Sequence, residues 1–238
     1  MRLPSPRTAA QRGVHEDRPY ELWLPETPGP WPGIVILHGA GSRKENHGDF
    51  ARAAIGYGWA ALTFDQRGHG SSEDVMSPAA VGDVTRMTRL LGATEGVDPD
   101  RICVRGSSMG GFMAIHAAAV SDALAGAIAI CPAGEEDLLR GLRRGELEMR
   151  VDAPALEAWL EEHDIREAVE LMAAKPLLLI HAGGDEQIPY TWSEELYRHA
   201  REPRKLIVLA GGHHRSAQHD AEVHGIALRW LERALSGA

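Results

Sequence analysis

Residues of the three types that make up a nucleophilic site lie far apart in this sequence. The first is a G-x-S-x-G segment, Gly106-Ser107-Ser108-Met109-Gly110, with Ser108 at its centre. An apolar run, Ile102 to Val104, precedes the segment and an Ala- and Met-rich stretch follows it, which predicts a turn from a buried strand into a helix. Such a turn holds a serine hydroxyl clear of the sheet, beside a helix N-terminus. Ser108 is therefore the candidate nucleophile; the alternative is a glycine-rich turn with a surface serine.

A serine hydroxyl is a weak nucleophile at neutral pH, so it needs a base, and the base needs an acidic group to orient it. Asp185 follows the apolar run Pro176 to Ile180, and His213 and His214 follow the apolar run Leu206 to Leu209. Loops at the carboxyl ends of parallel strands meet in one crevice. The order serine, aspartate, histidine is the order that an α/β-hydrolase fold requires.

Apolar runs and helical segments alternate through most of the chain, and these elements must position the candidate groups. Strands are expected at residues 20–24, 33–37, 60–64, 102–104, 124–130, 176–180 and 205–209. Helices are expected between them and at residues 221–235. The alternation predicts an α/β fold with a doubly wound, mostly parallel sheet, forming one domain over residues 1–238. Residues 1–19 are expected to form a loose arm or an irregular first strand.

A charged stretch at residues 134–164 breaks this alternation. It is too long for an ordinary connection between a strand and a helix, so a small helical lid inserted within the domain is predicted. A solvated helical excursion with no part in binding is the alternative. The arginines of this stretch could steer an anionic substrate, although neighbouring glutamates cancel much of their charge; these arginines are Arg140, Arg143, Arg144 and Arg150.

Composition narrows the classes of partner. The 238 residues include 25 Lys and Arg against 34 Asp and Glu, a net charge of −9, which disfavours nucleic acid and anionic membranes as partners. No apolar run is long enough to cross a bilayer, and residues 1–19 lack the apolar core of a signal peptide. Cys103 and Cys131 lie in apolar runs and are expected as buried thiols. The expectation is a cytoplasmic monomer or homodimer with no metal and no cofactor.

Five motifs in order resemble those of small bacterial serine esterases of the α/β-hydrolase superfamily, similar to cinnamoyl/feruloyl esterases and dienelactone-hydrolase-like proteins. The resemblance covers residues 20–237. Ala182 departs from it, because such proteins usually carry glycine at that position. The motifs are L-H-G-A-G-S at Leu37–Ser42, D-Q-R-G-H-G-S-S at Asp65–Ser72, D-P-D-R-I-x-V-x-G-S-S-M-G-G at Asp98–Gly111, I-H-A-G-G-D at Ile180–Asp185 and G-G-H-H at Gly211–His214.

The resemblance implies a catalytic triad with Ser108 as nucleophile, Asp185 as acid and His214 as base. His214 is preferred because members of the family place the base last in a G-x-x-H turn, and His213 is the alternative. The remaining candidates, His219 and His224, are expected to be surface histidines.

The resemblance also implies an oxyanion hole made of two backbone N–H groups. One comes from Met109, the residue after the nucleophile, and the other from Ala40, in the loop after the first central strand. His38 is expected to tie this loop by hydrogen bonds, with substrate contact as the alternative. Residues 65–72 are expected to be structural.

The implied activity is hydrolysis of a small-molecule carboxylic ester, with a short-chain or small aromatic acyl group, through an acyl-enzyme. Met109, Trp159 and Trp192 could line an acyl pocket or only pack. A serine peptidase or amidase on the same fold is the first alternative, and a non-catalytic ligand-binding protein of that fold is the second.

Overall fold

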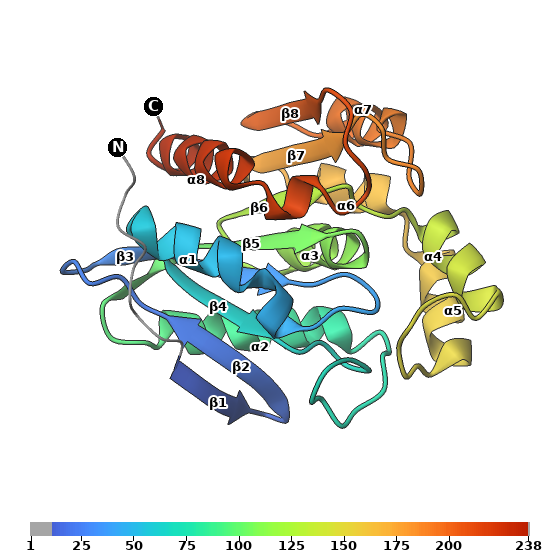
Figure 1. The fold of residues 1–238 in the computed structure, drawn as a ribbon, viewed down its shortest axis with the longest axis horizontal. Coiled ribbons are helices and arrows are strands. Elements are labelled where there is room, and N and C mark those ends of the chain that lie inside the picture. Colours follow the sequence, from blue (N-terminus) through green and yellow to red (C-terminus); the bar gives the residue numbers. More distant parts are fainter. Residues whose placement is uncertain (1–10, 238) are drawn as a thin grey trace.

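The computed structural model describes residues 11–237, and its centre is one eight-stranded sheet (Figure 1). The strand order is β1-β2-β4-β3-β5-β6-β7-β8; β1–β2 and β2–β4 pair antiparallel and all other neighbours pair parallel. The predicted mostly parallel α/β sheet is thus confirmed. The strands are β1 (Gln11–His15), β2 (Arg18–Trp23), β3 (Trp31–Leu37), β4 (Ala60–Phe64), β5 (Val97–Ser107), β6 (Gly126–Ile130), β7 (Leu177–Ala182) and β8 (Arg204–Leu209).

The apolar runs account for the centre of this sheet. Every residue of β4, β6 and β7 is buried, as is expected of parallel strands covered on both faces. At one edge, β1 has mostly exposed residues and pairs with β2. The irregular first strand expected near the N-terminus is therefore present as β1, while residues 1–10 of the expected arm lie outside the described residues.

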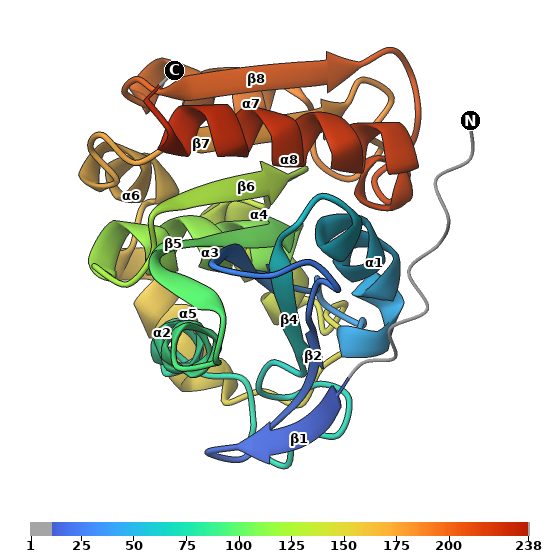
Figure 2. The same cartoon turned by 90° about the vertical axis from the view of Figure 1, so that its left-hand side faces the viewer.

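Helices cover both faces of the sheet (Figure 2). Apolar side chains of α1 and α8 form the core on one face, and those of α2, α3, α6 and α7 form the core on the other. The helices are α1 (Gly48–Gly56), α2 (Ala80–Gly92), α3 (Met109–Val120), α4 (Glu135–Arg143), α5 (Ala153–Glu162), α6 (Ile165–Leu171), α7 (Thr191–His199) and α8 (Ala221–Leu235), with short 3₁₀ helices η1 (Lys44–His47) and η2 (Ala217–His219). Within the described part of the chain, no helix is both long and apolar enough to cross a membrane.

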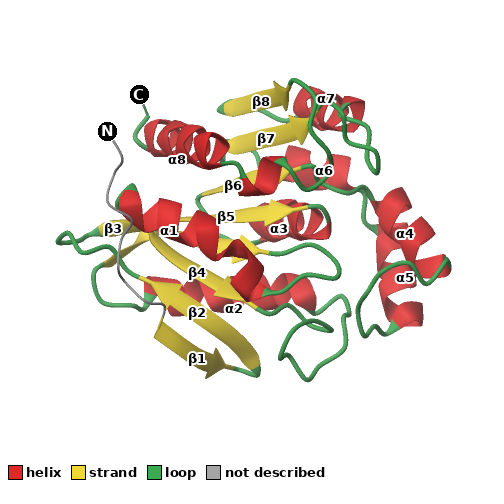
Figure 3. Ribbon diagram, viewed as in Figure 1, coloured by secondary structure: helices red, strands yellow, loops and turns green. Residues whose placement is uncertain are grey.

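The predicted helical insertion lies between β6 and β7. Residues 134–164, here called the cover segment, contain α4 and α5, and the arrowheads of β5 and β7 point toward the side of the molecule where these helices lie (Figure 3). Arg143 joins the two helices, since its guanidinium lies 2.6 Å from Glu157 and 2.5 Å from Glu161. Arg140 pairs with Asp137 on its own helix. These arginines are thus engaged in ion pairs within the cover segment.

Candidate active site

Ser108 sits at a sharp turn between β5 and α3. Its backbone has φ 53° and ψ −123°, a conformation rare for a residue with a side chain. The turn is possible because glycines stand on both sides. A Cβ on Gly106 would lie 1.9 Å from the Gly110 carbonyl oxygen, and a Cβ on Gly110 would lie 2.5 Å from the His38 carbonyl oxygen. The close approach of the α3 N-terminus to β5 and β3 therefore explains the G-x-S-x-G spacing.

His214 and Asp185 come together from the loops after β8 and β7. His214 Nδ1 lies 2.7 Å from Asp185 Oδ2, and both side chains are nearly inaccessible to solvent. His213 is exposed, and its Nδ1 accepts a hydrogen bond from the N–H of Arg215 at 3.3 Å. Of the two adjacent histidines, the geometry therefore places His214 against the carboxylate.

The Asp185 carboxylate is held by a set of donors. Oδ1 accepts the N–H groups of Gln187 and Ile188, each at 2.9 Å, and Oδ2 lies 3.3 Å from His181 Nε2. Burial by itself would raise the pKa of Asp185, but the hydrogen bonds from His181, His214 and the two N–H groups hold it well below its usual range. The carboxylate is thus charged at neutral pH and can orient an imidazole and stabilise its protonated form.

Ser108 and His214 line one cavity of about 480 Å³, here called the Ser108 cavity. No hydrogen bond joins the two side chains among the described residues, as is common where such contacts tighten only when substrate is bound. Polar residues dominate the other walls, with Leu147 as the largest apolar one; these walls are Gly39, Ala40, Gly41, Ser42, Asn46, Glu146, Leu147, Glu148, Gln187, Arg215, Gln218 and His219.

Two backbone N–H groups near Ser108, those of Met109 and Ala40, have no acceptor among the residues that the structure describes. Met109 is the first residue of α3, so its N–H has no acceptor within the helix. Neither this N–H nor that of Ala40 donates a hydrogen bond to any residue in the described part of the chain. Ala40 lines the same cavity as Ser108. The arrangement supplies two free donors from the two loops in which the oxyanion hole was predicted.

His38 supports the loop that carries Ala40. It is fully buried, its Nδ1 lies 2.9 Å from the Gly39 carbonyl oxygen, and its Nε2 accepts the Gln66 N–H at 3.1 Å. Burial lowers its pKa to about 4, so the ring is neutral. The contacts agree with the expected structural role. Asp65 plays a similar part, because its buried carboxylate accepts the backbone N–H and the ammonium group of Lys44 at 2.9 Å and 2.8 Å.

The sequence of this chain matches the model of a known protein family. Residues 34–174, more than half of the chain, match the family model described as the alpha/beta hydrolase family. The chain belongs to this family. The uncharacterized protein YfhR of Escherichia coli O157:H7 is 27% identical over 222 residues, covering 87% of this chain and 72% of YfhR. The 2,6-dihydropseudooxynicotine hydrolase of Paenarthrobacter nicotinovorans is 34% identical over 114 residues, covering 46% of this chain and 30% of that enzyme.

Solved structures agree with this membership of the hydrolase family. The α/β hydrolase GrgF from Penicillium sp. sh18 has a TM-score of 0.79 at 17% identity, over 96% of this chain and 99% of that chain. Est1E from Butyrivibrio proteoclasticus has a TM-score of 0.76 at 19% identity, over 97% and 100% of the two chains. At this level of identity the likeness shows the shared α/β-hydrolase fold.

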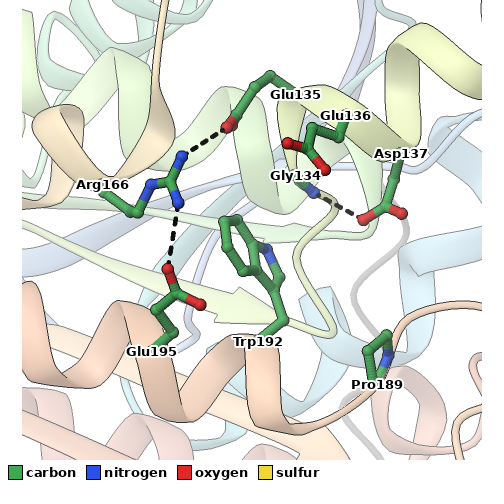
Figure 4. A pocket seen from close by; sticks show the side chains of 8 residues that line it. All are labelled: Gly134, Glu135, Glu136, Asp137, Arg166, Pro189, Trp192 and Glu195. Atoms are coloured by element: carbon green, nitrogen blue, oxygen red, sulfur yellow. Dashed lines mark hydrogen bonds and ion pairs between the residues drawn. The ribbon is translucent and has the colours of Figure 1, made fainter.

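The large side chains proposed for an acyl pocket lie elsewhere in this hydrolase. Met109 is 1% exposed and belongs to the core, and Trp159 stacks on His163 at 4.5 Å between ring centroids. Trp192 lines a separate hollow of about 310 Å³ between α4 and α7 (Figure 4). The Arg166 guanidinium carbon lies 5.5 Å from the centroid of the Trp192 ring. None of these three side chains lines the Ser108 cavity.

The expected surface position of His224 is wrong, and the cover segment contributes carboxylates to the cavity walls. His224 was expected at the surface, but it is 2% exposed and its Nε2 lies 2.8 Å from the Gln218 carbonyl oxygen. The cover segment places Glu146 and Glu148 in the walls of the Ser108 cavity, and not the arginines that could have steered an anion. Neither placement has a signal in the sequence, because both depend on how distant segments pack.

One group of side chains has the spacing of metal ligands in the described part of the hydrolase. Cys131, His181 and Asp185 each place one ligand atom within 4.8 Å of the others. Burial raises the pKa of the Cys131 thiol to about 12, so it is protonated and a poor ligand at neutral pH. Asp185 already binds His214, so the group is explained by packing around that carboxylate. Cys103 and Cys131 are both buried and free, as expected.

Proposed function

We propose that this chain is a serine hydrolase that cleaves carboxylic esters, with Ser108 as nucleophile, His214 as base and Asp185 as the acid that orients it. The observation that carries the proposal is the 2.7 Å contact between His214 Nδ1 and Asp185 Oδ2, on a histidine that shares a cavity with Ser108. A neutral imidazole that donates through Nδ1 has its Nε2 lone pair free to take a proton.

The reaction proceeds in two displacements. Ser108 Oγ bonds to the ester carbonyl carbon while its proton moves to His214 Nε2, and the carbonyl electron pair moves onto the oxygen. The N–H groups of Ala40 and Met109 stabilise that oxyanion. The bond from carbon to the alcohol oxygen then breaks, and the alcohol leaves with the proton from His214. Water then gives a proton to His214 and bonds to the acyl carbon. The bond from that carbon to Ser108 Oγ breaks, Oγ takes the proton back from His214, and the acid leaves.

The size and the class of the proposed substrate rest on different observations. The cavity of about 480 Å³ suits a short-chain or small aromatic acyl group. Proteins that share the fold carry ester-cleaving names, among them acetyl xylan esterase 1 from Thermoanaerobacterium sp. JW/SL YS485 and the esterase domain of a Rhodothermus marinus protein, and Est1E has been solved with ferulic acid bound.

Labelling with a fluorophosphonate, followed by peptide mapping, tests the nucleophile. We expect one adduct per chain, on Ser108, and a fall in kcat/KM of about 10⁴-fold for p-nitrophenyl acetate in Ser108→Ala. Ser107→Ala is the matched control, because Ser107 is the adjacent serine, 2% exposed, and its Oγ has no partner among the described residues. An adduct on any other residue would contradict the proposal.

Matched p-nitrophenyl esters and aminoacyl anilides then separate an esterase from an amidase.

A further inference from the structure

A second hollow continues from the Ser108 cavity. It has a volume of about 400 Å³ and shares with that cavity the residues Gly41, Ser42, Asn46 and Glu148. Its remaining walls are Arg43, Gly68, His69 and Gly70. The Glu148 carboxylate therefore stands between the cavity beside Ser108 and a polar hollow that the proposed chemistry does not use. We call this space the Glu148 hollow.

The backbone two residues after Glu148 is held in place, although this part of the cover segment is exposed. Two residues further on, the N–H of Arg150 donates to the Gly68 carbonyl at 3.1 Å, and the Arg150 carbonyl accepts the N–H of Met76 at 2.8 Å. The Arg150 guanidinium donates to the Glu73 carbonyl at 3.0 Å. These bonds tie the backbone after Glu148 to the loop that forms the opposite wall of the hollow.

The side chain of Glu148 turns toward the loop of the proposed oxyanion hole. Its Oε2 lies 2.8 Å from the point where a Cβ on Gly41 would stand. Gly41 follows Ala40, whose N–H has no acceptor within residues 11–237. A carboxylate at this place faces any substrate that passes from Ser108 into the Glu148 hollow.

The carboxylate of Glu148 is the group in the walls of the hollow that favours a cationic ligand with hydrogen-bond donors, and it has no ion-pair partner within the described residues. The Arg43 guanidinium, also in these walls, lies 3.7 Å from Glu45, a carboxylate that also lies 2.8 Å from the Lys44 ammonium group. His69 is 4% exposed and its Nδ1 lies 2.8 Å from the Arg67 carbonyl oxygen, so Nδ1 carries the proton. Its Nε2 is then an acceptor without a partner among the described residues, but this atom is closed to solvent and is not offered to a ligand in the hollow. The exposed acceptor in these walls is the Glu148 carboxylate, which also carries the negative charge.

We propose that Glu148 selects ester substrates that carry a primary ammonium group, which lies in the Glu148 hollow while the ester lies beside Ser108. The inference rests on the proposed function and specifies its substrate class. An ammonium group supplies both the opposite charge and N–H donors for the Glu148 carboxylate, and charge-assisted hydrogen bonds are the stronger ones. Arg215, the guanidinium in the walls of the Ser108 cavity, does not line the Glu148 hollow.

Two isosteric substrate pairs test the proposal. Methyl 6-aminohexanoate is compared with methyl heptanoate, and 6-aminohexyl acetate with heptyl acetate, so that the ammonium replaces a methyl group on the acyl or the alcohol side. We expect at least one amine to exceed its neutral partner about tenfold in kcat/KM, and Glu148→Gln to reduce that ratio to within about twofold. The control Glu162→Gln removes the same charge from exposed α5, outside both spaces, and keeps the wild-type ratio.

Binding to Ser108→Ala separates this inference from the proposed function. Calorimetry with the same esters measures binding without turnover, and we expect the favoured amine to bind about tenfold more tightly than its neutral partner, a difference that Glu148→Gln removes. Equal binding of amine and neutral ester overturns the inference, even if the wild type hydrolyses p-nitrophenyl acetate. If the amine binds more tightly than its neutral partner but the wild type hydrolyses no ester, the ammonium site at Glu148 is supported and the proposed function is overturned. If Glu162→Gln lost the preference for the amine as fully as Glu148→Gln, the preference would come from the net charge of the protein, and the role assigned to Glu148 would be overturned.

Discussion

The crevice at the carboxyl edge of the sheet and the cover segment at residues 134–164 are built in opposite ways. In the crevice, Asp185 and His214 are buried and joined at 2.7 Å. In the cover segment, charges lie at the surface, as in the pairs of Arg143 with Glu157 and Glu161, whose side chains are 36–54% exposed. Buried groups keep one geometry because any displacement leaves a polar atom without a partner, whereas exposed ion pairs contribute little to stability.

From this contrast we infer that the crevice carries out the proposed reaction and that the cover segment influences which substrates enter. The crevice holds the groups proposed to make and break bonds, and they come from strand ends that the core positions. The cover segment contributes Glu146, Leu147 and Glu148 to the walls of the Ser108 cavity. Substitutions in the crevice are therefore expected to abolish activity or folding, and those in the cover segment to change selectivity or stability modestly.

The largest effect is expected from the adjacent histidines of the crevice. His214→Ala removes the proposed base, and we expect kcat/KM for p-nitrophenyl acetate to fall about 10³- to 10⁴-fold. His213→Ala removes an exposed ring that does not face Asp185, so the rate should stay within about threefold of wild type. Steady-state kinetics, with circular dichroism to verify folding, measure both. The opposite ranking would assign the base to His213 and would break the account of the crevice.

Alanine substitution at one glycine of each region tests how closely the backbone is packed there. Gly106→Ala would place a Cβ 1.9 Å from the Gly110 carbonyl oxygen, which cannot move without displacing α3, so we expect a loss of more than about 3 kcal/mol in the free energy of unfolding. Gly145, in the cover segment, has φ +66° and no atom within 4 Å of the corresponding Cβ. Gly145→Ala should therefore cost only the strain of a left-handed residue, about 1 kcal/mol. Urea unfolding measures both, and equal losses would contradict the comparison.

The smallest effect, on the pH dependence of stability, is expected at the joint between the two regions, the contact of His116 in α3 with Trp159 in α5. His116 of α3 is 6% exposed and lies 5.2 Å from Trp159 of α5 between ring centroids, and burial lowers its pKa to about 4. Between about pH 6.5 and pH 4 the unfolded chain binds a proton that the folded chain does not, so this histidine lowers the free energy of unfolding as pH falls. His116→Phe should reduce that loss by up to about 1.4 kcal/mol per pH unit within this window.

Urea unfolding of wild type and His116→Phe at pH 7, 5.5 and 4.5 measures this difference. The wild type is expected to lose more stability than the variant across the series, while His38, whose pKa burial also lowers to about 4, contributes equally to both. Parallel curves for the two proteins would show that the joint does not titrate in this range.

Much of the fold could be predicted from the sequence because its signals are local. The apolar runs that became β3, β4 and β7 are continuous, as the burial of central parallel strands requires. The glycines beside Ser108 mark a close backbone approach. Other features had no local signal. His224 was expected at the surface, yet it packs against Phe50 at 4.9 Å between ring centroids, because α8 folds back on α1.

Residue types and their spacing were enough to predict the α/β-hydrolase fold, the strand-to-helix turn at Ser108 and the chain order of the candidate serine, aspartate and histidine. The three-dimensional arrangement was needed to show that His214 and not His213 meets Asp185, and that carboxylates of the cover segment line the Ser108 cavity while its arginines do not. Those outcomes depend on side-chain direction and on contacts between segments far apart in the chain, and the local sequence predicts neither.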